Sequence, residues 1–352
     1  MNKFNAFLKR KDIVFSAKRY GIDAMSAMAQ GLFCSLLIGT IINTLGTQFS
    51  LPFLNEIGGF ATSMSGPAMA CAIGYALKAP PLVLYSLLAV GASANSFGGA
   101  GGPLAVLLIA IIAAELGKAV SKETRIDLIV TPFVTIFSGV GLSALIAPFI
   151  GEAASALGRL IMQATELQPL LMGIIVSVLV GIALTLPISS AAICAALSLT
   201  GLAGGAAVAG CSAQMIGFAV MSFRENGVGG LLSQGIGTSM LQMGNIVRNP
   251  KIWIPPILAS AITGPLATCV FHLEMNGAPI SSGMGTCGLV GQIGVYTGWV
   301  SDIAAGTKTA ITAFDWVGLV LICFVLPAVL TWVFGQILRK IGWIKENDLK
   351  LD

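Results

Sequence analysis

The chain has 352 residues, of which 56% are hydrophobic and only 10% are charged. A soluble domain carries about 25% charged residues, so this composition excludes an ordinary soluble protein and predicts an all-α polytopic membrane protein. The net charge of +4 is small and concentrated near the chain ends, which indicates membrane topology and not nucleic-acid binding. The seven cysteines lie in apolar segments without a CxxC pair, so we expect neither disulfides nor a metal site.

The first 20 residues mix basic and apolar side chains, with Asp12 as the one acid. This mixture predicts an amphipathic helix over residues 1–20 that lies on the cytoplasmic surface of the bilayer. A basic tail that only sets the orientation is the alternative, but it does not account for the interleaved aromatic residues. Either interpretation places the N-terminus in the cytoplasm.

Apolar runs then predict the membrane elements in chain order. Spans are expected at about 25–45, 60–77, 82–94, 104–116, 128–150 and 170–186, with an interfacial helix at 151–167, one long or two short helices at 191–221, and a last span at 316–338. The glycine-rich stretch 95–103 predicts a turn or break, since so many glycines cannot continue a helix. Basic residues after the last span predict a cytoplasmic C-terminus, and we expect about ten membrane elements, of which one or two are re-entrant.

Two similar motifs, at 235–241 and 283–289, share the pattern Gly-x-Gly-Thr-(Ser/Cys)-x-Leu. Glycines that interrupt a helix at membrane depth release backbone N–H groups, and only a cavity or protein contact can satisfy them. The motifs therefore predict a solute site, and the alternative is that their glycines only allow close helix packing. The candidate binding residues from this stretch are Gly237, Thr238, Ser239, Gln242, Gly285 and Thr286.

Ionisable and amide side chains within apolar surroundings add further candidates. Glu274 is the leading one, because an ionisable group at membrane depth costs about 2.5–3.5 kcal/mol on insertion scales and is usually functional. His272 lies two residues away and could exchange a proton with it; alternatively, both lie at the membrane interface at a helix end. Amides both donate and accept hydrogen bonds, which suits a neutral polyhydroxylated solute. The amide candidates are Asn95, Asn276 and Gln292, although some amides in such segments only join helices.

Enzyme chemistry has little support in the sequence. His272 is the sole histidine, so no HExxH site exists, and the chain contains no Walker A motif. No dinucleotide fingerprint within a strand–turn–helix unit is present either. We therefore expect no catalytic residues, no cofactor and no self-contained catalytic machinery; at most the chain is the membrane subunit of a phosphotransferase.

Residues 235–242, 249–256 and 283–292 resemble the EIIC-like membrane proteins of the phosphotransferase system, EIIC type 2, and most closely the branch that includes the PfoR-type proteins. The resemblance implies a homodimer with re-entrant hairpins and an elevator-type motion. Residues 21–150 would form the scaffold and dimer contact, residues 151–312 the substrate-binding region, and residues 313–352 the last span and a cytoplasmic tail. It also implies the bacterial cytoplasmic membrane and separate EIIA- and EIIB-type phosphocarrier partners.

In sugar-specific members of that family a glutamate in a Gly-Ile-Thr-Glu-Pro-like motif binds the sugar. Glu274 is the candidate match for this glutamate, although its spacing to Pro279 differs from that motif. The first hypothesis is thus a permease for a small polar solute of the sugar or sugar-like class, with phosphorylation by separate partner proteins as one form of coupling. A ligand-sensing regulator without transport and a secondary transporter of a small organic anion are the alternatives.

Overall fold

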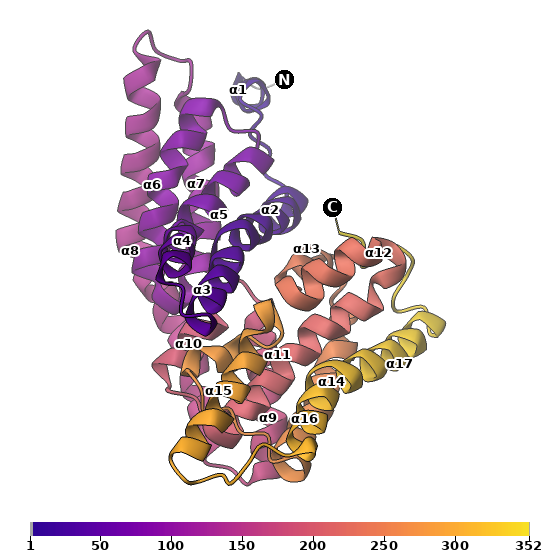
Figure 1. Cartoon of the computed structure of the whole chain (residues 1–352). Helices are drawn as coiled ribbons and strands as arrows, with labels where there is room; N and C mark the ends of the chain where they lie inside the picture. The colour runs from indigo at the N-terminus through magenta and orange to yellow at the C-terminus, as the bar shows by residue number, and fades with distance from the viewer. Residues whose placement is uncertain (1–2, 352) are drawn as a thin grey trace. The chain divides into compact units, whose positions relative to one another are not determined.

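The computed structural model describes residues 3–351, which are almost entirely helical (Figure 1). Its only β-type pairing in this range is the isolated bridge between Gly201 and Met275. The prediction of an all-α membrane protein is confirmed: the described residues contain six apolar helical stretches long enough to cross a bilayer. These are Arg19–Gln48, Pro81–Val120, Asp127–Thr165, Gly201–Met221, Pro250–Val270 and Ala313–Lys340, with the shorter apolar helix Pro169–Thr185 beside them.

The chain divides into two compact units, Met1–Ala153 and Ala154–Asp352, and passes from one to the other within α8. The helices of the first unit are α1 (Lys3–Arg10), α2 (Ala24–Leu32), α3 (Ile38–Gln48), α4 (Pro52–Ser63), α5 (Ser65–Ala76), α6 (Pro81–Gly98), α7 (Gly102–Val120) and most of α8 (Asp127–Thr165). Those of the second are α9 (Pro169–Thr185), α10 (Ser190–Ala196), α11 (Gly201–Met221), α12 (Phe223–Leu232), α13 (Met243–Arg248), α14 (Ile254–Pro265), α15 (Val290–Ala304), α16 (Ala313–Val320) and α17 (Leu326–Lys340).

Glycines set the helix contacts of the first unit. Gly31, Gly39 and Gly46 on the α2–α3 stretch closely approach, in that order, Ala68, Thr62 and Asn55 on the α5–α4 stretch, so the two stretches run antiparallel. In a bilayer, helices associate through such close packing and not through hydrophobicity. The glycine-rich break at 95–103 is also present: Gly99 has a φ of +50°, and α6 folds back onto α7 so that Gly117 meets Val83. The 40-residue stretch Pro81–Val120 is therefore a hairpin.

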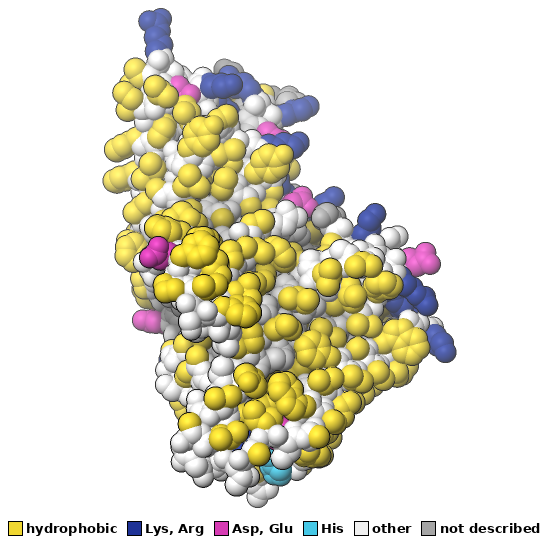
Figure 2. Space-filling view, in the orientation of Figure 1, with side chains coloured by type: hydrophobic (Ala, Val, Ile, Leu, Met, Phe, Trp, Pro, Cys, Tyr) yellow, Lys and Arg dark blue, Asp and Glu magenta, His cyan; other side chains and the backbone are white. Residues whose placement is uncertain are grey.

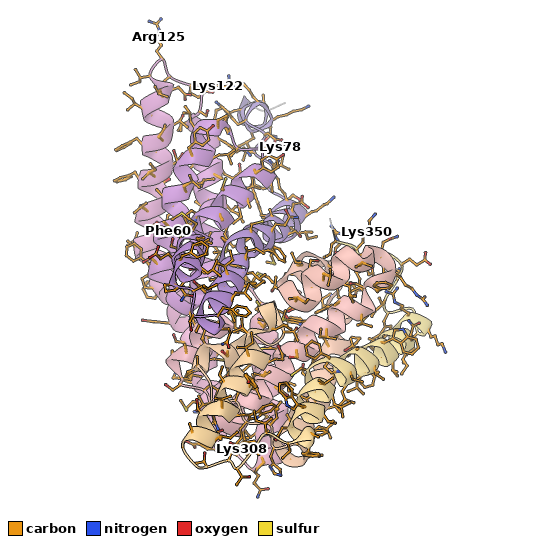
Figure 3. All side chains as sticks on the ribbon, viewed as in Figure 1. Phe60, Lys78, Lys122, Arg125, Lys308 and Lys350 are labelled. Atoms are coloured by element: carbon orange, nitrogen blue, oxygen red, sulfur yellow. The ribbon has the colours of Figure 1, made fainter. Side chains whose placement is uncertain are left out.

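The N-terminal helix is shorter than expected, since α1 ends at Arg10 and the chain turns at Asp12, which has a φ of +51°. Arg19 donates to the Asp12 carboxylate at 2.8 Å, and this hydrogen bond holds the pKa of Asp12 below its usual value. Lys and Arg side chains of the first unit gather at the end that carries α1, where Figure 3 labels Lys78 and Lys122 (Figures 2 and 3). Elsewhere on the visible face hydrophobic side chains predominate, as a lipid-facing surface requires (Figure 2).

Helix α11 is the central element of the second unit, and nearly all of its residues are buried. Its small residues let neighbouring backbones approach: a Cβ on Gly210 would lie on the Ser177 carbonyl of α9, and one on Gly217 would meet Thr331 of α17. Residues 191–221 thus form two helices, α10 and α11, joined by a short turn. The interfacial helix expected at 151–167 is instead the last part of α8.

Candidate functional site

A short non-helical segment, residues 272–276, brings three predicted site residues to one place. Leu273 and Met275 are buried in a hydrophobic cluster with α11 and α15, whereas His272 and Glu274 are exposed and Asn276 is half-buried. From Leu273 to Asn276 this alternation is that of an extended backbone, in which successive side chains point to opposite faces, whereas His272 turns the chain with a φ of +45°. Two hydrogen bonds of 3.0 Å between the backbones of Met275 and Gly201 fix the segment against the start of α11.

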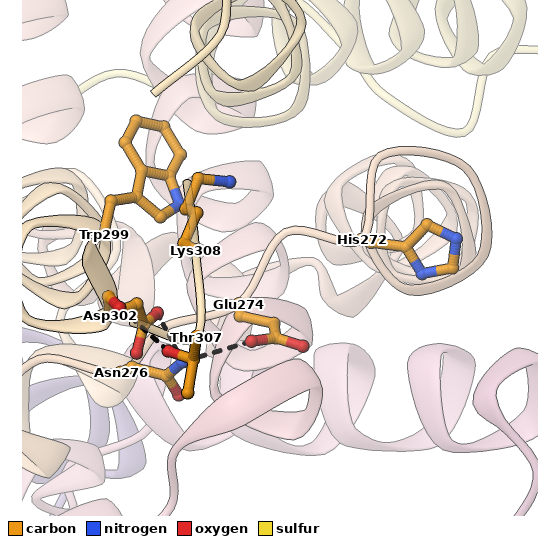
Figure 4. Close-up of a pocket in the computed structure, with 7 residues that line it drawn as sticks. All are labelled: His272, Glu274, Asn276, Trp299, Asp302, Thr307 and Lys308. Atoms are coloured by element: carbon orange, nitrogen blue, oxygen red, sulfur yellow. Dashed lines mark hydrogen bonds between the residues drawn. The ribbon is translucent and has the colours of Figure 1, made fainter. Parts of the chain in front are cut away.

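Asn276 organises the polar side of this segment (Figure 4). Its Oδ1 accepts a hydrogen bond from the Gly201 N–H at 3.1 Å, which fixes the direction of the side-chain amide. Its Nδ2 then donates to Glu274 Oε2 at 3.1 Å and to Asp302 Oδ2 at 2.9 Å. One amide thus positions two carboxylates that come from segments far apart in the sequence.

The remaining wall is formed by the end of α15 and the loop that follows it. The Asp302 backbone carbonyl accepts hydrogen bonds from the N–H groups of Thr307 and Lys308 at 2.9 and 3.1 Å, so the loop folds back over the helix end. Lys308 Nζ lies 2.8 Å from Asp315 Oδ1 and 5.8 Å from the centroid of the Trp299 ring. This ion pair leaves Glu274 and Asp302 without a cationic partner among the contacts of the described residues.

Together these groups line a cavity of about 440 Å³. Its lining residues are His272, Glu274, Asn276, Trp299, Asp302, Thr307 and Lys308. The cavity carries two carboxylates against one ammonium group that Asp315 already neutralises, so its net charge is negative at neutral pH. Carboxylate and amide oxygens accept hydrogen bonds from hydroxyl groups, and an aromatic wall suits the apolar face of a ring.

The sequence prediction named three of these residues, and His272, Glu274 and Asn276 do line one cavity. Figure 4 shows His272 at its edge, apart from the Asn276 hydrogen bonds. Asp302 and Trp299 were not among the candidates. Asp302 could have been found by the argument that selected Glu274, since it is a lone carboxylate in the apolar run of α15.

The two Gly-x-Gly-Thr motifs contact each other directly. Thr286 Oγ1 donates to the Gly235 carbonyl oxygen at 2.5 Å, and both residues are buried. Gly285 has a φ of +53°, and a Cβ there would lie 2.5 Å from the Cys211 side chain on α11. Gly237, the second glycine of the first motif, is buried. These contacts pack the two motifs closely together, and the roles of Gly237, Gly285 and Thr286 in solute binding stay predictions.

The other predicted residues bond to protein partners outside the cavity. Thr238 accepts from the Met240 N–H at 3.2 Å, and Ser239 Oγ lies 2.8 Å from Thr185 Oγ1. Gln292 Nε2 donates to Ser212 at 3.3 Å. Gln242 donates a hydrogen bond to the carbonyl oxygen of Leu349 near the C-terminus. Asn95 lies in the first unit, where it donates to Ser65 Oγ at 3.3 Å. Their roles in solute binding stay predictions.

No group of three or more His, Cys, Asp or Glu side chains that could hold a metal ion occurs among residues 3–351. The cavity around Asn276 offers hydrogen-bond acceptors from Glu274 and Asp302 and an aromatic wall from Trp299.

Comparison with known proteins gives one match. Residues 22–351 match the family model described as "Phosphotransferase system, EIIC", which covers nearly the whole chain. No curated protein and no solved structure matches the chain.

Proposed function

The chain belongs to the phosphotransferase system EIIC family, and we propose that its cavity between Glu274 and Asp302 binds a neutral polyhydroxylated solute, a sugar or sugar-like compound, which the protein moves across the membrane. Membership makes the chain a membrane permease component that works with EIIA- and EIIB-type phosphocarrier proteins. The phosphoryl donor then belongs to a partner, and this chain supplies the solute site and the path.

The observation that carries the proposal is the pair of carboxylates held by Asn276. Both are positioned by a single amide, and neither has a cation to neutralise it within the cavity. A solute with hydroxyl groups can donate to both carboxylates, and charge-assisted hydrogen bonds are roughly twice as strong as neutral ones. The same charges oppose an organic anion, which weakens the case for an anion transporter.

The first prediction is that Glu274→Gln weakens solute binding by roughly 10- to 150-fold, which corresponds to about 1.5–3 kcal/mol. The change keeps the shape of the side chain and removes its charge, so it separates electrostatics from packing. Asp302→Asn should also weaken solute binding, because Asp302 accepts a hydrogen bond from the same Asn276 amide as Glu274 does. A thermal-shift screen of sugars and organic acids identifies a ligand, and titration calorimetry then gives the affinities.

Glu166→Gln is the matched control, since Glu166 is an exposed carboxylate outside the cavity. It should leave the affinity unchanged. If a folded Glu274→Gln protein binds as tightly as the parent, the cavity is not the solute site. Counterflow in liposomes then distinguishes a permease from a regulator that binds the same ligand without net flux.

The proposal also includes a homodimer in the bacterial cytoplasmic membrane, with both termini in the cytoplasm. Residues 21–150 would provide the static scaffold and residues 151–312 the moving, substrate-carrying region. The division into two compact units and the basic end of the first unit support this arrangement.

We expect native mass spectrometry in mild detergent to detect dimers. We also expect impermeant thiol reagents to leave single cysteines in α1 unlabelled in intact cells. Monomers alone, or labelling of α1, would contradict it.

A further inference from the structure

The C-terminal segment, residues 343–351, is held by amide side chains of residues 222–249, here called the α12–α13 segment. Asn226 contacts it twice: Nδ2 donates to the Leu349 carbonyl oxygen at 2.8 Å, and Oδ1 accepts from the Leu351 N–H at 2.8 Å. An asparagine that pairs in this way with two main-chain groups recognises a peptide irrespective of its side chains.

Three more amides extend this contact. Gln242 donates to the Leu349 carbonyl oxygen and Asn245 to the Lys350 carbonyl oxygen, both at 2.9 Å. Asn249 donates to the Trp343 carbonyl oxygen at 3.0 Å, and its second bond, at 2.8 Å, goes to the Asp348 carboxylate. All but one of these contacts are with main-chain atoms of the segment.

The side chains of the segment contribute two apolar anchors. Leu349 is fully buried and Ile344 is 3% exposed, whereas Lys345, Glu346 and Lys350 are exposed. Figure 3 labels Lys350 beside the α12 and α13 helices. The segment is therefore held by two buried apolar side chains and by hydrogen bonds to its main chain.

The amides are also connected to the first Gly-x-Gly-Thr motif. Gln242 Nε2 donates to Gln234 Oε1 at 2.9 Å, and Asn245 Nδ2 donates to Gln242 Oε1 at 2.8 Å. Gln234 and Gln242 are fully buried and flank the motif on either side. When the segment leaves, the Gln242 and Asn245 amides lose hydrogen bonds in a buried place, which is unfavourable unless another group replaces them.

We propose that Asn226, Gln242, Asn245 and Asn249 form a binding site for peptide main chain. Residues 343–351 are its occupant, and occupation holds the α12–α13 segment in its packed conformation. When the C-terminal segment is released, the α12–α13 segment can bend at glycines in α12. Helix α12 is interrupted at Gly227, which has a φ of +58°, and a Cβ on the neighbouring Gly229 would meet nothing within 4 Å. The bound C-terminal segment thus stabilises the first Gly-x-Gly-Thr motif, which packs against Thr286, and its detachment would remove this support.

The test uses a chain that ends at Gly342, which keeps all of α17, and a synthetic peptide of residues 343–351. We expect truncation to speed amide hydrogen exchange in residues 222–249 at least tenfold, and the peptide to restore the slow exchange. A Leu349→Asp peptide should bind at least tenfold more weakly, while a Glu346→Ala peptide, altered at an exposed position, should bind as the parent does.

Unchanged exchange after truncation, or no binding of the parent peptide, would overturn the proposal. Should the truncated chain not fold, full-length Asn226→Asp decides the question, because it keeps the acceptor for Leu351 and turns the Leu349 donor into a repelling oxygen. Tryptic cleavage after the exposed Lys345 should then be at least tenfold faster than in the parent. An unchanged cleavage rate would refute the proposal. These readouts need no solute, so they are independent of the cavity proposal.

Discussion

Replacing Gly205 with alanine is expected to destabilise the protein by about 3 kcal/mol or more and to displace Glu274 from the cavity. A Cβ at this position would lie 1.6 Å from the Leu273 carbonyl oxygen, which is a severe steric clash. Overpacking a core usually costs about 1–3 kcal/mol, and the upper end applies where only backbone can yield. Here the backbone belongs to buried α11 on one side and to the 272–276 segment on the other.

The effect should appear in two measurements. The melting temperature in mild detergent should fall by several degrees, and solute affinity should fall with it, because the segment that moves carries Glu274. Gly141→Ala is the matched control: Gly141 lies in α8, and a Cβ there meets nothing within 4 Å. That change should be neutral or stabilise by up to about 1 kcal/mol, since alanine favours helix. Equal stability of the two variants would contradict the packing argument.

The fold class could be predicted because membrane insertion leaves a direct mark on composition. Apolar runs located the long helices, and the glycines at 95–103 located the reversal between α6 and α7. The boundaries of the shorter elements could not be predicted in the same way. Residues 60–77 form parts of α4 and α5, divided at Met64, and the helical pair is set by glycines on α2 and α3 that meet it. Such pairing depends on residues elsewhere in the chain.

The candidate site shows the same limit. Glu274 and Asn276 could be found because polar groups in apolar surroundings are costly. Their partner Asp302 lies in a later helix, and only the tertiary fold shows that one amide joins the two carboxylates. His272 was expected to exchange a proton with Glu274, whereas the structure connects Glu274 to Asn276.

The Gly-x-Gly-Thr motifs were ambiguous for a physical reason. A glycine followed by a hydroxyl residue can line a cavity or allow close packing, and the outcome depends on which atoms approach it. Cys211 on α11 fills the space beside Gly285. The Gln242 amide donates a hydrogen bond to the C-terminal segment. Both partners are distant in sequence, so local pattern could not identify them.

Lys118→Met should destabilise the first unit by about 3–5 kcal/mol, the usual result of removing one partner of a buried ion pair. Lys118 is 2% exposed, and its ammonium group lies 3.0 Å from Glu115 Oε2. It also donates to the carbonyl oxygens of Leu77 at 3.0 Å and of Asp12 at 2.7 Å. Methionine fills a similar volume but offers no donor, so Glu115 loses its cation in a buried place.

Thermal or denaturant unfolding in mild detergent measures the loss, and Lys122→Met is the control at an exposed lysine near the same end of the unit. The double variant Lys118→Met with Glu115→Gln should recover part of the stability, because it removes the uncompensated carboxylate while keeping its shape. Incomplete recovery is expected, since the Asp12 carbonyl still lacks its donor and the chain between α1 and α2 loses an attachment. A single variant as stable as the Lys122→Met control would show that lipid or water replaces the lysine, and that the N-terminal segment is held by Arg19, whose guanidinium donates to Leu77 at 2.6 Å.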